Sequence, residues 1–264
     1  MALLELYKTI QQEEWIDIPE GWLQGRTLYG GLAAAMLMQK AMSVVHDQSK
    51  QLLNCSITFV GPIQQAKVRL TAEILREGKS VTTVEVRLWQ DDAVQTLMVA
   101  SFGAKRSSCI HVAAQPDVPV LSAPNEQHIY PVHALAPQCM HNMQLIWVEG
   151  QRPCTASPVP DFTGWMRFHP DQHVNRMMTL PDMILAFDMW PPGVLSMLPS
   201  IAPASSLTWH LSYLEPLQNQ MHDWMKYQVK TEAAADGYSH ERAYLWDANN
   251  RLIAMAHQTV TIFA

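Results

Sequence analysis

The segments VEVRLWQDDAVQTLMVASF (residues 84–102) and ERAYLWDANNRLIAMAHQT (residues 241–259) align with each other without a gap. Both carry a Leu-Trp pair at the same point. Residues typical of a tight turn follow each pair, Asp91-Asp92 in one segment and Asn249-Asn250 in the other. Each segment therefore predicts two strands joined by a turn, and their match indicates that the chain contains one structural unit twice.

The order of the surrounding elements supports this duplication. In the first half, the pattern predicts an apolar helix followed by four strands, over residues 32–45, 52–60, 66–78, 80–90 and 94–104. In the second half, it predicts a short strand, a helix that breaks or kinks at Pro191-Pro192, and four strands, over residues 161–170, 180–198, 205–217, 223–234, 239–250 and 251–263.

The first of these helices is apolar on nearly every face, so another layer must wrap it. We therefore expect an α+β fold in which two helix-wrapped antiparallel sheets join as a pseudo-dimer. Joining them edge to edge would protect a hydrogen-bonding edge of each sheet. Prolines spread through residues 107–140 predict a linker or loose crossing between an N-terminal unit (1–106) and a C-terminal unit (141–264).

Composition excludes several classes of partner. The net charge of −6 disfavours a nucleic-acid binder, because such proteins usually carry a basic face. Charged residues make up 16% of the chain, against roughly 25% in typical soluble domains, which predicts surface buried in a homo-oligomer, a dimer or a tetramer. The longest strongly apolar stretch, GGLAAAMLM (30–38), is shorter than the roughly 20 residues that a membrane span needs.

The expected compartment is the cytoplasm. Residues 1–15 become polar too early for a secretory signal. Neither CxxC spacing nor a small disulfide framework is present among the four cysteines, Cys55, Cys109, Cys139 and Cys154. Reduced thiols fit this pattern best.

Motifs for several kinds of chemistry are missing from the sequence. It has no GxxxxGK[ST] phosphate loop, no GxGxxG, no GxSxG elbow and no HExxH. His169 and His173 have a spacing that suits metal ligation on a helix, but Pro170 lies between them and no third ligand is evident. We expect a solvent-exposed loop there, and neither a metal nor a cofactor.

Asp188 is the unusual residue of the second helix, because it lies in the apolar run ILAFDMWPPG (184–193). A buried, unpaired carboxylate would have a raised pKa or would require hydrogen-bond donors. Alternatively, the helix ends at Asp188, which is then solvated or caps the next segment. The residues alone leave both interpretations open.

Gln258 lies in the last predicted strand on the face of Ala254, Ala256 and Val260, where small side chains leave room for a ligand. A glutamine satisfied by neighbouring backbone is the simpler interpretation. The gap-free alignment places Ser101 at the corresponding position of the first half.

Hydroxyl groups open the strand SSLTWHLSYL, where Ser206 and Thr208 are either turn caps or ligands. Gly30 and Gly31 precede the first helix, so backbone N–H groups there would point towards a bound anion or carbonyl. The other interpretation of this glycine pair is close packing of backbone at a crowded helix start.

The stretch QGRTLYGGLAAAM, the pair LNCSITFVGP and SSLTWHLSYLEP, and the ending GYSHERAYLWDANNRLIAMAHQTVTIF together resemble the acyl-CoA thioesterase II family of double-hotdog enzymes. The resemblance covers nearly the whole chain except its proline-rich middle. It implies a double-hotdog fold and hydrolysis of fatty acyl-CoA by a water molecule, without a metal or a covalent serine intermediate.

The resemblance also implies roles for single residues. The family's catalytic Asp falls on Asp188, its Gln on Gln258 and its hydroxyl residue on Ser206, where many relatives have Thr. Two residues later many relatives have another Asp, and this chain has Thr208, so a two-residue slide would change the hydroxyl assignment. The backbone of Gly30 and Gly31 is the expected oxyanion donor.

The sequence also agrees with two other functions. A hotdog enoyl-CoA hydratase or dehydratase would pair an Asp with a His on one helix, and no His lies near Asp188. A non-catalytic acyl-CoA or lipid-binding protein would keep the fold without the chemistry.

Overall fold

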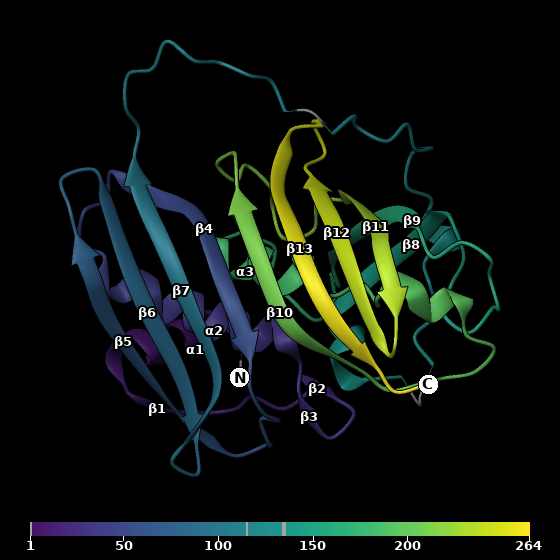
Figure 1. The fold of residues 1–264 in the computed structure, drawn as a ribbon, viewed down its shortest axis with the longest axis horizontal. Helices are drawn as coiled ribbons and strands as arrows, with labels where there is room; N and C mark the ends of the chain where they lie inside the picture. Colours follow the sequence, from purple (N-terminus) through teal and green to yellow (C-terminus); the bar gives the residue numbers. More distant parts are fainter. Residues whose placement is uncertain (1, 115, 134–135) are drawn as a thin grey trace.

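The computed structural model describes residues 2–114, 116–133 and 136–264. Within them, one 11-stranded antiparallel sheet dominates the molecule (Figure 1). Its strand order is β1-β5-β6-β7-β4-β10-β13-β12-β11-β9-β8. The strands of the first half are β1 (Trp15–Asp17), β4 (Lys50–Phe59), β5 (Lys67–Glu77), β6 (Val81–Gln90) and β7 (Ala93–Ala104). Those of the second half are β8 (Met143–Glu149), β9 (Phe162–Phe168), β10 (Ala204–Tyr213), β11 (Met225–Ala235), β12 (Tyr238–Trp246) and β13 (Leu252–Ile262).

The sheet consists of two copies of one unit, which confirms the expected pseudo-dimer. The order β5-β6-β7-β4 in the first half corresponds to β11-β12-β13-β10 in the second. The two copies join edge to edge where β4 pairs with β10, from Asn54 opposite Ser212 to Thr58 opposite Thr208. Each copy thereby covers the hydrogen-bonding edge of the other.

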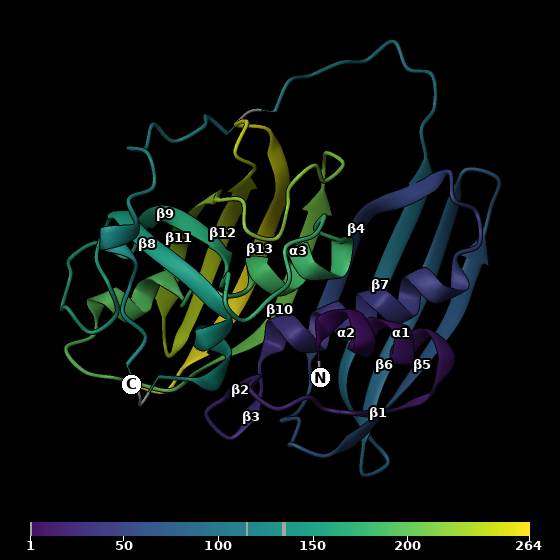
Figure 2. The same ribbon diagram turned by 180° about the vertical axis from the view of Figure 1, so that it is seen from behind.

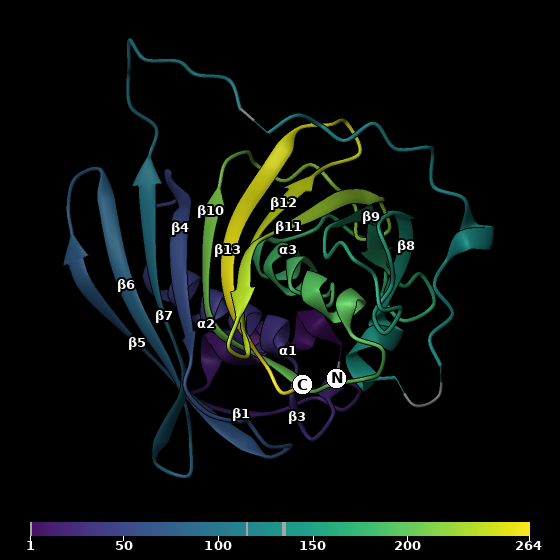
Figure 3. The same ribbon diagram turned by 45° about the vertical axis from the view of Figure 1, so that its right-hand side comes forward.

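The α-helices of the described residues lie on one side of this sheet, as Figure 2 shows from behind. They are α1 (Leu3–Gln12), α2 (Gly30–Val44) and α3 (Leu180–Phe187). Helix α2 is buried from Gly31 to Gln39, as its apolar sequence predicted, and it packs against α3. Figure 3 shows the C-terminal half of the sheet curving around α3, with β9 and β8 on the far side of that helix.

Helix α3 is shorter than the sequence predicted. A helix over residues 180–198 with a break at the prolines was expected, but the helix ends at Phe187 and a separate 3₁₀ turn, η3 (Gly193–Met197), follows. Pro191 disfavours the helical conformation at Trp190, and the Met189 N–H closes the last turn on the Ala186 carbonyl at 3.0 Å. The break therefore falls before the prolines instead of at them.

The proline-rich segment over residues 107–140 crosses between the halves, with residues 115 and 134–135 outside the described part of the chain. It runs over the C-terminal half of the sheet (Figure 1), where the Trp165 indole donates to the Ser122 carbonyl at 2.9 Å and Lys226 to the Pro119 carbonyl at 3.0 Å. Its described residues form the short 3₁₀ turn η1 (Glu126–His128) and begin a second one, η2 (Gln138–Asn142). None of the described helices is long and apolar enough to cross a membrane.

Candidate active site

Asp188 is the residue that ends α3. Its backbone has left the helical conformation in part (φ −87°, ψ 1°), so it occupies the C-cap position. The residue is partly buried, and its carboxylate faces the first residues of α2, where a Cβ on Gly30 would lie 3.0 Å from Asp188 Oδ2. Both interpretations of the sequence therefore describe part of the structure, a helix end and a carboxylate held by the protein.

The other end of α3 is fixed by a buried ion pair. Arg176 donates to both oxygens of Asp182, at 2.7 and 2.9 Å, and Asp182 is fully buried. Asp182 also accepts the backbone N–H and the hydroxyl of Thr179, at 2.8 and 2.5 Å, which completes a capping box. These contacts determine where α3 starts, and a helix of only eight residues then places Asp188 at its other end with little freedom.

The start of α2 is built around Tyr29. Its hydroxyl donates to the carbonyl of Leu185 at 2.7 Å, in the last turn of α3, so one buried hydrogen bond ties the two helices together. A Cβ on Gly31 would lie 2.4 Å from the Tyr29 ring, and only glycine leaves the ring room to fold over this position. The Gly31 N–H donates to Asp188. The helix start thus faces the carboxylate directly.

Gln258 and Ser206 complete the site from two neighbouring strands. The Gln258 Nε2 atom donates to Asp188 Oδ1 at 3.2 Å and to Ser206 Oγ at 2.7 Å. Gln258 shares its inward face of β13 with Ala256 and Val260, as predicted. One amide group therefore joins the carboxylate and the hydroxyl.

A β-bulge in β10 decides which hydroxyl reaches this site. Pairing with β13 shifts between Ser206 and Thr208, which leaves Leu207 without a partner. The extra residue turns Ser206 to the same face as Gln258, whereas Thr208 is exposed. The hydroxyl in contact with Gln258 is that of Ser206.

Burial dominates the electrostatics of Asp188. Removal of the carboxylate from water raises its pKa from 3.8 to about 7, although Gln258 and the Gly31 N–H lower it by donating to the charged form. In turn, the negative charge of Asp188 helps to raise the pKa of Tyr29, for which burial is the main cause. A carboxyl group of this pKa exchanges its proton near neutral pH.

The structure corrects the predicted counterpart of Gln258. Four residues separate the paired residues Trp89 and Val94, but five separate Trp246 and Leu252, so the second hairpin turn is one residue longer. A one-residue shift turns every following side chain to the opposite face. The position equivalent to Gln258 is the buried Ala100, and not Ser101, whose hydroxyl lies 3.4 Å from that of Thr83.

His169 and His173 do not form a ligand set with a third residue within the described ranges. The ring of His169 accepts the Asp171 N–H at 3.1 Å. The ring of His173 packs against those of Trp22 and Phe168, and burial lowers its pKa from 6.5 to about 4. The predicted exposed loop is therefore partly buried at His173.

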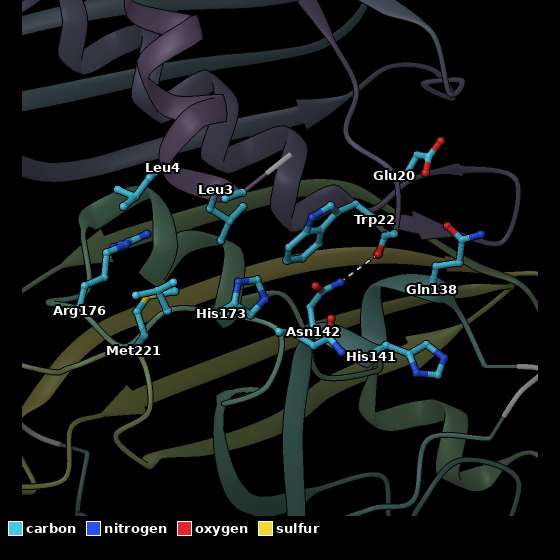
Figure 4. A pocket seen from close by; sticks show the side chains of 14 residues that line it. Leu3, Leu4, Glu20, Trp22, Gln138, His141, Asn142, His173, Arg176 and Met221 are labelled. Atoms are coloured by element: carbon cyan, nitrogen blue, oxygen red, sulfur yellow. Dashed lines mark hydrogen bonds between the residues drawn. The ribbon is translucent and has the colours of Figure 1, made fainter.

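His173 lies in the wall of a cavity of about 410 Å³ (Figure 4). This cavity lies between the start of α1, η2 and the loop before α3, and the Asn142 side chain crosses it to the Gly21 carbonyl at 2.9 Å. The Trp22 ring lines this cavity and stacks on the Tyr29 ring, at 6.4 Å between their centroids. The cavity is thus near the α2 start, but neither Asp188 nor Gln258 lines it.

Sequence reasoning missed Tyr29, which positions both glycines and α3. An aromatic residue directly before a glycine pair at a helix start was the available signal, since a ring there needs a neighbour without a side chain. It also missed Cys139 on η2, which is close enough for Asp188 to help raise the pKa of its thiol to about 12, an effect mainly of burial.

Comparison with known proteins gives the family. The acyl-CoA thioesterase N-terminal domain model matches residues 18–103, and the C-terminal domain model matches residues 115–262. The second match alone covers more than half of the chain. The chain belongs to the acyl-CoA thioesterase family. The resemblance seen in the sequence and the double-hotdog fold are both confirmed.

Several solved structures share the double-hotdog fold of this chain. A hot dog fold protein from Alicyclobacillus acidocaldarius matches with a TM-score of 0.79 and 21% identity, over 95% of this chain and 92% of that one. The tesB protein of Mycobacterium avium subsp. paratuberculosis matches with a TM-score of 0.74 and 15% identity, over 100% of both chains. The acyl-CoA thioesterase II TesB2 of Mycobacterium marinum matches with a TM-score of 0.64 and 16% identity, over 90% of both chains. No curated protein sequence matches the chain.

Proposed function

We propose that the protein hydrolyses acyl-CoA thioesters to a free carboxylic acid and CoA, using a water molecule held by Asp188, Ser206 and Gln258. One observation carries the proposal: the Gln258 amide contacts both the Asp188 carboxylate and the Ser206 hydroxyl, at 3.2 and 2.7 Å. Three partly buried polar groups, from the end of α3, β10 and β13, thus converge beside buried apolar residues such as Ala256 and Val260. Such convergence is typical of a site that orients a small polar molecule.

Asp188 is the general base in this proposal. The water oxygen attacks the thioester carbonyl carbon while Asp188 accepts one of its protons. The C–S bond then breaks, and the departing thiolate takes the proton back from the Asp188 carboxyl group. A pKa of about 7 supports this role, because the group is ionised in part at neutral pH and still basic enough to take a proton.

The start of α2 supplies the remaining electrostatic stabilisation. The Gly31 N–H donates to Asp188 and orients it. The Gly30 N–H, at the first position of the same helix, is the proposed donor to the oxyanion of the tetrahedral intermediate. Ser206 and Gln258 hold the water, which is a positioning effect.

The alternatives predict different products. A hydratase or dehydratase would leave the thioester intact, and the eight-residue α3 carries no histidine to pair with Asp188. A non-catalytic binding protein would saturate with acyl-CoA and release no thiol. Family membership agrees with either hydrolysis or binding, so the assay must separate them.

The test is thiol release from a panel of acyl-CoAs of increasing chain length, with wild type and Asp188→Asn. We expect release with at least one chain length, reduced by a factor of about 100 or more in Asp188→Asn. Asp171→Asn, which removes a carboxylate from an exposed loop, is the matched control and should keep wild-type turnover. Saturable binding without thiol release, or wild-type turnover in folded Asp188→Asn, would contradict the proposal.

A further inference from the structure

Glu241 is a buried carboxylate that the proposed reaction does not use. Its exposed fraction is 5%, and it lies on β12 directly opposite Gln258 on β13. Directly opposed residues of an antiparallel pair project from the same face of the sheet, so Glu241 emerges beside the glutamine of the site. Burial raises the pKa of Glu241 to about 7, and the nearby Asp161 adds to this effect.

The duplication shows that this pair is particular to the second half. The Leu-Trp pairs of β6 and β12 place Val84 at the position of Glu241. Val84 lies opposite Ala100, and both are fully buried and apolar. At the same two positions the second half has Glu241 and Gln258. Both positions are therefore polar in the half that carries the site and apolar in the other half.

Glu241 contacts the segment that follows Asp188. Its carboxylate accepts the backbone N–H groups of Gly193 and Val194, the first residues of η3, and the Ser239 hydroxyl at 3.0 Å. These three donors satisfy a charge that burial would otherwise disfavour. The side chain thus holds the start of η3 against β12.

The chain between Asp188 and η3 is stiff. Pro191 and Pro192 each have a restricted φ, and Pro191 also restricts Trp190 before it. Met189 and Trp190 are buried, and the Trp190 ring packs against that of Tyr227 at 5.4 Å between centroids. A shift of η3 away from β12 would therefore be transmitted along this segment to Asp188.

We propose that Glu241 is a positioning residue that holds η3 against β12 and thereby sets the separation between the Asp188 carboxylate and the Gln258 amide. This role rests on the proposed function where it concerns turnover, but its structural part is independent of it. The role depends on the carboxylate as a hydrogen-bond acceptor. A side chain of the same shape that can still accept the Gly193 and Val194 N–H groups should therefore retain most of it.

Two substitutions distinguish the role of Glu241 as a hydrogen-bond acceptor from the role of its charge. Glu241→Gln and Glu241→Val both remove the charge, but only Gln retains an oxygen for the two N–H groups, and Val restores the residue of the first half. Hydrogen exchange followed by mass spectrometry on residues 189–198 should show at least tenfold faster exchange of these amides in Glu241→Val. Exchange in Glu241→Gln should stay within about threefold of wild type.

Turnover should also be affected more by Glu241→Val than by Glu241→Gln. In thiol release from acyl-CoA, kcat should fall about tenfold to a hundredfold in Glu241→Val with KM within about twofold, and Glu241→Gln should recover most of it. Glu73→Gln, on an exposed position of β5, is the control. Unchanged exchange and kcat in Glu241→Val, or equal losses in both variants, would overturn the proposal. If wild type releases no thiol, the proposed function fails, and the exchange experiment alone decides the positioning role.

Discussion

The Gln258 amide donates to the Asp188 carboxylate across 70 residues of sequence, at 3.2 Å. The last strand of the sheet and the end of α3 thus meet at one point. This contact stabilises the charged form of Asp188 and opposes the effect of burial on its pKa.

Replacing Gln258 by Ala removes that donor and the contact with Ser206. We expect kcat to fall by a factor of about 100 because the water loses its orientation. The Asp188 pKa should also rise, so that activity begins at higher pH than in wild type. A pH series of thiol release measures both effects. His257→Ala, on the opposite face of β13, is the control, and an unshifted profile in Gln258→Ala would show that the amide does not act on Asp188.

Gly30→Ala should separate activity from stability. The new Cβ would lie 3.0 Å from Asp188 Oδ2 and 3.3 Å from the Phe59 ring, so the carboxylate must move. Alanine also favours the helix by up to about 1 kcal/mol, so the free energy of unfolding should stay level or rise. We expect at least a tenfold loss of kcat without a loss of Tm. Ser43→Ala, at the far end of α2, should leave kcat unchanged; full activity in Gly30→Ala would argue against a tight fit between helix start and carboxylate.

Tyr29→Phe should weaken the junction between α2 and α3. The change leaves the Leu185 carbonyl without the 2.7 Å hydrogen bond in a buried interface, which costs about 1–2 kcal/mol of unfolding free energy. Urea denaturation measures this cost. Tyr238→Phe removes a hydroxyl from an exposed residue and should change stability by less than about 0.5 kcal/mol. Equal stability of the two variants would show that the Tyr29 hydroxyl does not support the junction.

Asp188→Asn should stabilise the protein at alkaline pH. The pKa of Asp188 is about 7 in the folded state and about 3.9 when unfolded, so the folded state holds the proton more strongly. The stability that Asp188 contributes is therefore complete below pH 4 and is lost as pH rises through 7. Relative to wild type, the variant should gain on the order of 2 kcal/mol between pH 5 and pH 8. Urea unfolding of both proteins at pH 5 and pH 8 measures this gain. A larger relative stability of the variant at pH 5 than at pH 8 would contradict a raised pKa of Asp188.

Much of the fold was predictable because the repeat is local. The alternation of apolar residues along β6, β7, β12 and β13 and the two turns are properties of neighbouring residues. Helix α1 was missed, although Leu3, Leu6, Tyr7 and Ile10 form an apolar stripe at helical spacing and are buried. This stripe is a property of the local sequence, so the helix was predictable from it.

The parts of the site that were not predictable depend on single-residue shifts between strands. Alternation along β10 does not reveal that a bulge at Leu207 turns Ser206 inward, and the gap-free alignment does not reveal that Ala100 replaces Ser101. Pairing partners determine both. The family resemblance placed Asp188, Ser206 and Gln258 together. The contacts of Gly31 and Tyr29 with the end of α3 arise only when the two helices pack.

The pH dependence of kcat/KM for thiol release tests directly whether Asp188 accepts the proton of the attacking water. The profile reports the free enzyme's essential base. In wild type we expect activity to rise with pH through an apparent pKa of about 7. Glu241→Gln should show the same rise, and the residual activity of Asp188→Asn should not. A wild-type profile that is flat from pH 5 to pH 9, or the same rise in Asp188→Asn, would contradict the claim.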